Sequence, residues 1–210
     1  MKAHRSTLTV AAVLVAVFAP ALSAQAPPPA TEVGGAQLVL LTVPAKGGAK
    51  LTVTTPAFGP MGDIPFENTQ YKGNVFPGLS WSAGPAATKS YVIIMQDADA
   101  MMRGAPILHW TMLNIPASTT KLLPGMTAPP SGAANGPNMR GPSQPYTGPR
   151  TPAGPKHRYH LQVFALDTPL TADAITTFDG LTAAMKDHVL ASGEVVGLGQ
   201  FMPPSGSQQR

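Results

Sequence analysis

Two carboxylates and two imidazoles lie where short apolar segments meet loops rich in proline and glycine. Asp97 and Asp99 follow the apolar run 91–95, His109 begins a second apolar segment, and His157 precedes a third. Strand ends that lead into loops commonly hold binding groups on a rigid scaffold. Imidazoles donate hydrogen bonds and become cationic near neutral pH, and a neighbouring carboxylate orients an imidazole and favours its charged form. The placement of these side chains therefore indicates a candidate binding site.

Each of these residues also has a purely structural interpretation. An Asp-x-Asp sequence after a strand is most often a turn in which the carboxylates accept hydrogen bonds from their own backbone. We expect Asp99 to organise the loop, and Arg158 to form an ion pair rather than to clamp a ligand. Trp81 and Trp110 are expected in the core.

The elements that must position these residues are mostly strands. Short β-rich or alternating segments bounded by turn residues are typical of strands. One helix is predicted over 180–191, with Asp179 as its N-cap and Gly193 beyond its end. Residues 124–156 are predicted to form a long irregular loop, because they are rich in Pro, Gly, Ser and Asn. The predicted strands cover residues 37–43 and 51–55, joined as a hairpin or meander through Gly47 and Gly48, and then 79–82, 91–95, 109–115, 159–166 and 194–201.

The composition supports a β-rich fold and excludes several kinds of site. The 210-residue chain has 21 glycines and 24 prolines, together about a fifth of its residues, and both interrupt helices. We therefore predict a mainly β protein, an antiparallel β-sandwich with one or two short peripheral helices. The chain has no cysteine, which excludes disulfides, thiolate metal sites and cysteine nucleophiles. Its net charge of +4 is too small to indicate nucleic-acid binding.

The N-terminus has the order of regions found in secretory signal peptides. Basic residues precede an apolar run over 8–19, and small residues follow. We predict a signal peptide over 1–25, with cleavage between Ser23 and Ala26, a Pro-rich flexible lead-in over 26–36, one domain over 37–203 and a frayed tail over 204–210. The apolar run is too short to span a bilayer comfortably. The mature protein is therefore expected to be periplasmic or secreted, without a stable membrane anchor.

Three ordered blocks resemble the phosphatidylethanolamine-binding protein family, in particular its bacterial Raf kinase inhibitor-like branch. The first block reads Leu-Ser-Trp-Ser at 79–82, Thr-Lys-Ser-Tyr at 88–91 and Asp-Ala-Asp-Ala at 97–100. The second is His-Trp at 109–110 with Asn-Ile-Pro at 114–116, and the third spans 146–154 and continues into His-Arg-Tyr at 157–159. The resemblance covers roughly residues 74–201.

This resemblance implies a β-sandwich with a small pocket for anions such as phosphate groups. We expect Asp97 to orient or charge an imidazole, while His109 and His157 contact the anion. The family usually reads Asp-Pro-Asp-Ala-Pro where this chain has Asp-Ala-Asp-Ala-Met, and Thr151 replaces a proline. The residues implied for the pocket are Asp97, Asp99, His109, Pro149, Pro152, His157 and Tyr159.

The leading functional hypothesis is an exported, non-catalytic module that binds a small anion or a phospholipid headgroup and needs no cofactor. A protein-interaction regulator, such as a protease or kinase inhibitor, is the first alternative. The second is a metal-dependent hydrolase, because two histidines and a carboxylate match a common metal-ligand set. Ser80, Ser90 or Ser143 could also complete a Ser-His-Asp arrangement, but the chain has neither His-Glu-x-x-His nor Gly-x-Ser-x-Gly.

Overall fold

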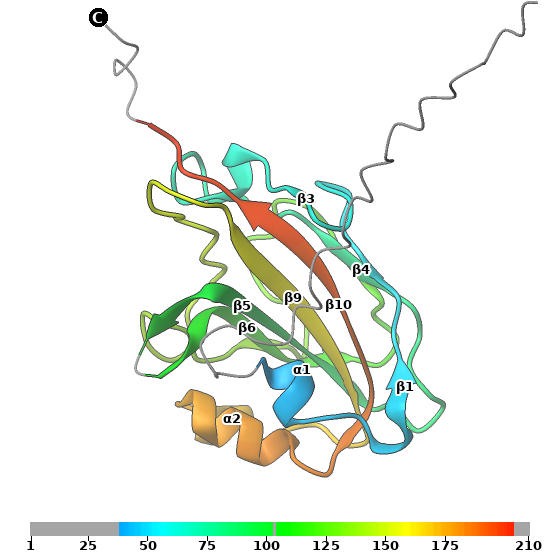
Figure 1. Ribbon diagram of the computed structural model, residues 1–210. Helices are drawn as coiled ribbons and strands as arrows, with labels where there is room; N and C mark the ends of the chain where they lie inside the picture. Colours follow the sequence, from blue (N-terminus) through cyan, green and yellow to red (C-terminus); the bar gives the residue numbers. More distant parts are fainter. Residues whose placement is uncertain (1–37, 103, 204–210) are drawn as a thin grey trace, which may run out of the picture.

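Two β-sheets face each other, and two short helices cover the outer face of the larger one (Figure 1). The computed structural model describes residues 38–102 and 104–203. The smaller sheet has the order β2 (Val53–Thr54), β4 (Leu79–Trp81) and β7 (Lys121–Leu122). The larger sheet has the order β1 (Ala49–Lys50), β10 (Val189–Gly199), β9 (His157–Leu166), β5 (Ser90–Met102), β6 (Ala105–Pro116) and β8 (Ala134–Asn135), and β3 (Gly62–Asp63) also pairs with β10.

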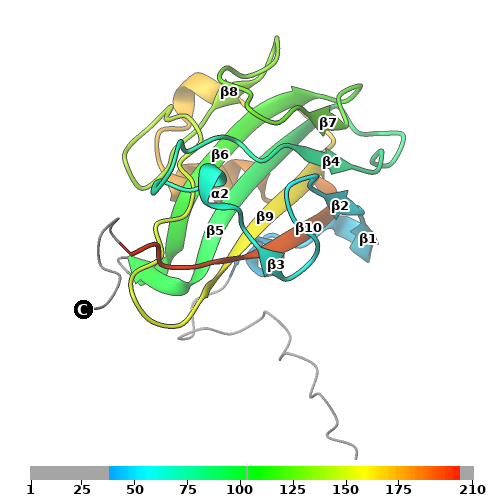
Figure 2. The same cartoon turned by 90° about the horizontal axis from the view of Figure 1, so that it is seen from above.

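The central strands of the larger sheet are buried on both faces. In β5, Tyr91, Ile93 and Met95 belong to the core between the two sheets, whereas Val92 and Ile94 belong to a second core beneath the helices. Successive side chains of a strand point to opposite faces, so a strand covered on both sides reads as a continuous apolar run. The second core is closed by α1 (Val39–Thr42) and α2 (Phe178–Met185). The view from above in Figure 2 separates β2, β4 and β7 from the helical side.

The prediction of a mainly β sandwich with one or two short helices is confirmed. The long central pairs β10–β9, β9–β5 and β5–β6 are antiparallel, while β1 and β3 pair with β10 in parallel. Three 3-10 turns complete the described elements: η1 (Lys46–Gly48), η2 (Phe66–Asn68) and η3 (Ala172–Ala174). Within the parts of the chain that are described, no helix is long and apolar enough to cross a membrane.

The hairpin predicted over 37–55 is wrong. Residues 39–42 form α1 instead, and Gln37 lies outside the described residues. Two buried glutamines explain the helix: Gln96 Oε1 accepts from Val39 N at 3.0 Å, and Gln162 Oε1 accepts from Leu40 N at 2.8 Å. They bind amide groups that the start of a helix leaves without partners. The residues of 51–55 contribute only the short strand β2.

The helix predicted over 180–191 begins and ends earlier. It runs over Phe178–Met185, and its N-cap is Thr177, whose hydroxyl accepts from Gly180 N at 3.1 Å, rather than Asp179. The chain then enters β10 at Val189, because pairing with β9 outweighs the local helical pattern. Gly193 therefore lies inside a strand, where an added Cβ would collide with the Leu51 carbonyl.

We expect Gly193→Ala to destabilise the fold by about 3 kcal/mol, because the colliding atom is backbone and cannot turn aside. Gly59→Ala is the matched control, since no atom lies within 4 Å of a Cβ placed there. Urea unfolding followed by circular dichroism measures both. Equal stability of the two variants would contradict the packing of residue 193 against Leu51.

Candidate functional site

The adjacent strands β5 and β9 bring Asp97 and Tyr159 opposite each other. The two residues are direct partners in the register, and His157 is the first residue of β9. The sequence analysis places Asp97 and Asp99 after a strand, whereas β5 continues to Met102. The strand is nevertheless irregular there, since Asp97 pairs with Ile107 and the next register pair joins Met101 to Pro106. Asp97 thus keeps register partners on both neighbouring strands, whereas Asp99 lies in the part of β5 that has no register partner.

His109 is the extra residue of a β-bulge in β6. Met95 pairs with Trp110 and the next residue, Gln96, pairs with Leu108, so His109 has no partner of its own. Bulges commonly redirect a side chain at a functional site. The His109 ring packs edge-on against Tyr159, with ring centroids 5.1 Å apart. The bulge therefore contributes the second imidazole to the cluster.

Asp97 holds the ring of His157. Its Oδ2 lies 2.9 Å from His157 Nδ1, and its Oδ1 accepts from Asp99 N at 2.9 Å. Asp97 is 2% exposed. A buried carboxylate is expensive unless it is paired and hydrogen-bonded, so both contacts are needed. Through them Asp97 fixes the orientation of the imidazole and the path of the following backbone.

Asp99 forms an ion pair with Arg158 instead of facing the cluster. Its two oxygens accept from the backbone N, Nε and Nη2 of Arg158 at 2.6, 2.9 and 2.7 Å. Burial opposes ionisation of Asp99, but these hydrogen bonds and the charge of Arg158 outweigh it and lower the pKa of Asp99. Asp99 thus ties β5 to β9 beside the site, and the guanidinium of Arg158 is held by it.

Tyr159 is a buried neutral phenol. Its hydroxyl lies 3.1 Å from the Thr151 hydroxyl. Burial raises the pKa of Tyr159, and the negative charge of Asp97 raises it further. The hydroxyl therefore keeps its proton at neutral pH and is available as a donor.

The carbonyl groups of Thr147 and Gly148 determine how His109 is protonated. They lie 3.1 and 3.2 Å from its Nδ1. A carbonyl oxygen only accepts, so Nδ1 carries a hydrogen and donates it. Burial lowers the pKa of His109 below its usual value, although the charge of Asp97 opposes the shift. The ring is therefore neutral at pH 7, with its lone pair on Nε2.

A polar segment over 68–74 clamps the loop that carries these carbonyls. Asn74 Nδ2 donates to Tyr146 O at 2.9 Å, and its Oδ1 accepts from Gly148 N at 2.7 Å. Gln70 Nε2 donates to Gly148 O at 2.7 Å, and Asn68 O accepts from the Tyr146 hydroxyl at 2.9 Å. A Cβ on residue 148 would collide with Asn68 O, which explains the glycine.

The sequence analysis missed this clamp. Its residues precede the loop by more than 70 positions, and no motif or periodicity connects the two segments. The only signal is an accumulation of amide side chains at 68, 70 and 74, which by itself is typical of a turn.

The two predicted prolines lie in different places. Pro149 is buried, and its carbonyl accepts from Gln70 N at 2.9 Å, which puts it on the clamped loop beside His109. Pro152 is exposed and lines a separate surface groove together with Tyr71 and Phe201. Of the residues predicted for the pocket, all but Pro152 therefore lie around Asp97 and His109 or directly beside them. Pro152 lies in the neighbouring groove.

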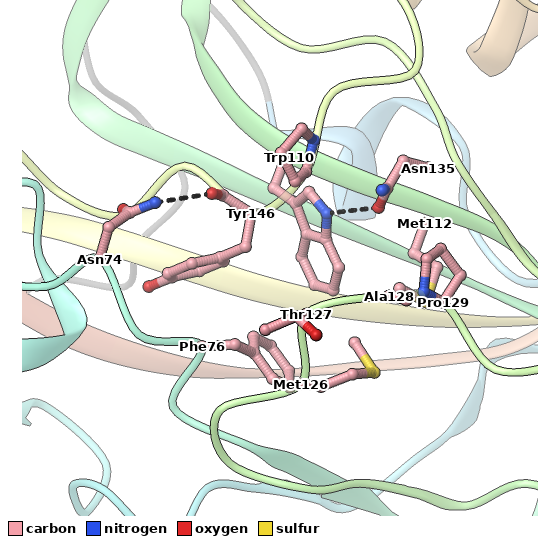
Figure 3. Close-up of a pocket in the computed structure, with 11 residues that line it drawn as sticks. Asn74, Phe76, Trp110, Met112, Met126, Thr127, Ala128, Pro129, Asn135 and Tyr146 are labelled. Carbon is pink, nitrogen blue, oxygen red and sulfur yellow. Dashed lines mark hydrogen bonds between the residues drawn. The ribbon is translucent and has the colours of Figure 1, made fainter.

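An aromatic cleft of about 200 Å³ is lined in part by Tyr146, which comes from the same loop (Figure 3). Phe76, Trp110 and Tyr146 pack against one another there, and Trp110 Nε1 donates to Asn135 Oδ1 at 3.1 Å. Among residues 38–102 and 104–203, no charged side chain lines it. The cleft cannot balance the charge of an anion, so we take the Asp97, His109 and His157 cluster as the candidate site.

No three His, Asp or Glu side chains in residues 38–102 and 104–203 come together in a way that could hold a metal ion. Around the candidate site, Asp97 binds His157 and Asp99 binds Arg158, while His109 donates to backbone carbonyls.

Comparisons with known proteins agree with the resemblance seen in the sequence. The model of the phosphatidylethanolamine-binding protein family matches residues 54–200. A UPF0098 protein of Methanothermobacter thermautotrophicus is 34% identical over 151 residues, covering 70% of this chain and 97% of its own length. A putative lipoprotein, LppC, of Mycobacterium tuberculosis is 32% identical over 161 residues, covering 76% of each chain.

A solved structure extends the agreement to the fold. YbcL of E. coli, described as a new member of the mammalian PEBP family, superposes with a TM-score of 0.66 at 26% identity, covering 73% of this chain and all of that one. The chain belongs to the phosphatidylethanolamine-binding protein family.

We expect Asn74→Gly to loosen the loop at 146–149 and to destabilise the protein by about 1–3 kcal/mol, because it leaves Gly148 N without its acceptor. Glycine tolerates the positive φ of residue 74, so only the side-chain hydrogen bonds are lost. Chemical denaturation measures the stability, and the NMR signals of the His109 ring report the loosening.

Met61→Gly is the matched control, because Met61 also has a positive φ and its side chain is partly exposed. We expect it to leave the His109 signals unchanged. Unchanged stability and unchanged ring signals in Asn74→Gly would contradict the clamp.

Proposed function

We propose that the protein is a binding module whose pocket, formed around Asp97, His109, His157 and Tyr159, takes a small anion such as phosphate or a phosphorylated headgroup. The observation that carries this proposal is the convergence of two imidazoles and a phenol, from the paired strands β5, β6 and β9, on one buried carboxylate. Each ring is held by the protein at a defined position, as a preorganised site requires.

The chemistry of the individual groups supports this function. His157 is bonded to Asp97 through Nδ1, so its Nε2 is left for a ligand and donates when the ring is protonated. The hydroxyl of Tyr159 is a further donor beside Asp97. Phosphate oxygens are strong acceptors that match such donors.

Binding rather than catalysis is supported by the surroundings of the two imidazoles. In the described parts of the chain, neither ring has a hydrogen bond to a serine or threonine hydroxyl that could act as a nucleophile. Ser90, one of the serines considered from sequence, donates instead to Thr168 O at 2.7 Å.

A protein partner is the second candidate function, and the β5–β6 hairpin favours it. Met101 and Met102 are 40% and 45% exposed at the end of β5, beyond Asp99. The hairpin projects on the left of both Figure 1 and Figure 2, where the C-terminal end of β10 also lies. Exposed methionines adapt to varied apolar partners.

Titration of the purified protein with methyl phosphate and phosphoethanolamine, followed by backbone amide NMR, tests the anion pocket. We expect saturable shifts around residues 97, 109 and 157, and at least a tenfold weaker affinity in His157→Ala, because the ring and the hydrogen bond it shares with Asp97 are removed.

The control for this titration is His188→Ala. His188 is also bonded to a carboxylate, Asp167 at 2.7 Å, but its side chain is 45% exposed and it follows α2. It should bind like the wild type. Equal binding by wild type and His157→Ala, or no saturable shift at all, would refute the proposed pocket.

We further propose that the protein is exported. The basic, apolar and small-residue order at the N-terminus supports this, as does the naming of the M. tuberculosis relative as a putative lipoprotein. The full chain expressed in E. coli should appear in the periplasm, with a mass that corresponds to cleavage between Ser23 and Ala26.

The variant Leu14→Arg interrupts the apolar run and should leave the protein uncleaved in the cytoplasm. Unprocessed wild-type protein in the cytoplasm would count against export.

A further inference from the structure

In both histidines of the pocket, Nδ1 is hydrogen-bonded within the protein, so Nε2 is the ring nitrogen that is left for a ligand. His157 Nδ1 is taken by Asp97, and His109 Nδ1 is taken by two backbone carbonyls. In His109 the hydrogen therefore resides on Nδ1, and the neutral ring offers a lone pair at Nε2. No hydrogen bond joins this Nε2 to any residue among 38–102 and 104–203.

The groups that face His109 keep the ring neutral. Burial outweighs the attraction of Asp97, and Arg140 adds a repulsive charge. Tyr159 packs against the ring from β9 as an uncharged phenol. Gly148 O, one of the two acceptors, is itself fixed by Gln70, so the carbonyl cannot easily turn away from Nδ1.

Arg158 and Arg140 already have side-chain partners. Arg158 is held by Asp99 through three hydrogen bonds. Arg140 donates through Nη2 to Gln70 Oε1 at 2.6 Å. An oxyanion without a proton would therefore bring an oxygen lone pair against the lone pair of His109 Nε2. This contact is repulsive, and it would lie close to the buried carboxylate of Asp97.

From this arrangement we infer that the pocket selects an oxyanion that carries its own titratable proton, a phosphomonoester or phosphate, over sulfate and over phosphodiesters. This inference rests on the proposed anion-binding function. The P–O–H group donates its hydrogen to Nε2 of His109, and the remaining oxygens accept from the other donors of the pocket. No covalent bond changes, and the proton stays shared between ligand and ring.

The need for a proton on the ligand also indicates the class of physiological ligand. A phosphodiester, such as an intact phospholipid headgroup within its lipid, has no proton to donate at neutral pH. A monoester retains one below its second pKa of about 6 and in part above it. The site is therefore better suited to a free phosphorylated small molecule than to a membrane lipid.

Three ligands test the selectivity. At pH 6.5, part of the methyl phosphate still has a proton to donate, whereas dimethyl phosphate is a monoanion without one and sulfate has charge without a proton. Isothermal titration of the purified protein should give methyl phosphate at least a tenfold higher affinity than either competitor. Its affinity should also fall more steeply than that of dimethyl phosphate between pH 6.5 and 8, because the ligand loses its proton.

The comparison of the two slopes separates the ligand proton from changes in the charge of the protein, which affect both ligands alike. His109→Gln replaces the acceptor by an amide that can also donate, and we expect it to bind the three ligands within about threefold of one another. His188→Gln is the control and should keep the selectivity of the wild type. Imidazole ¹⁵N shifts of the free protein should show His109 protonated at Nδ1 only.

The outcomes are distinguishable. Saturable binding of all three ligands with similar affinity overturns the selectivity and leaves the anion pocket intact. Selectivity that persists in His109→Gln also overturns it, since another group would then be responsible. Absence of saturable binding by any ligand overturns the proposed function and the inference with it.

Discussion

The buried carboxylate of Asp97 is the constraint on which the arrangement of the site depends. An ionised group with 2% exposure is tolerated only with good partners, because its desolvation costs several kcal/mol. One partner, His157, is the first residue of the neighbouring strand, and the other is the backbone of Asp99 in the irregular part of β5. The carboxylate therefore requires both the start of β9 and the distortion of β5 to be in place.

The sheet around Asp97 supplies the rigidity that this requires. The alternation of side chains puts Tyr91, Ile93 and Met95 of β5 into the core between the sheets, and Asp97 follows them in the same alternation. On the opposite face, Gln96 and Gln162 bind the start of α1. The same pair of strands thus anchors the helical layer with one set of side chains and the site with the other.

Structural features that depend on residues close together in the sequence could be predicted. Features that depend on contacts between distant segments could not. The apolar runs at 91–95 and 159–166 identified the central strands, and the charged residues beside them indicated the site. The strand expected at 37–43 is a helix because Gln96 and Gln162, distant in sequence, bind its amides. The clamp by Asn74 escaped detection for the same reason, since its partners lie more than 70 residues further on.

The two imidazoles are held by acceptors of different chemical kinds, and this gives them different roles. The group that holds His157 is the side-chain carboxylate of Asp97. The carbonyls that hold His109 do not titrate at any physiological pH, and no substitution of their own side chains removes them. The tautomer of His109 is therefore fixed by the backbone path of residues 147 and 148, which Gln70 and Asn74 secure. The glycine at 148 permits that path. The packing of this loop, rather than an acidic neighbour, therefore makes Nε2 of His109 a hydrogen-bond acceptor.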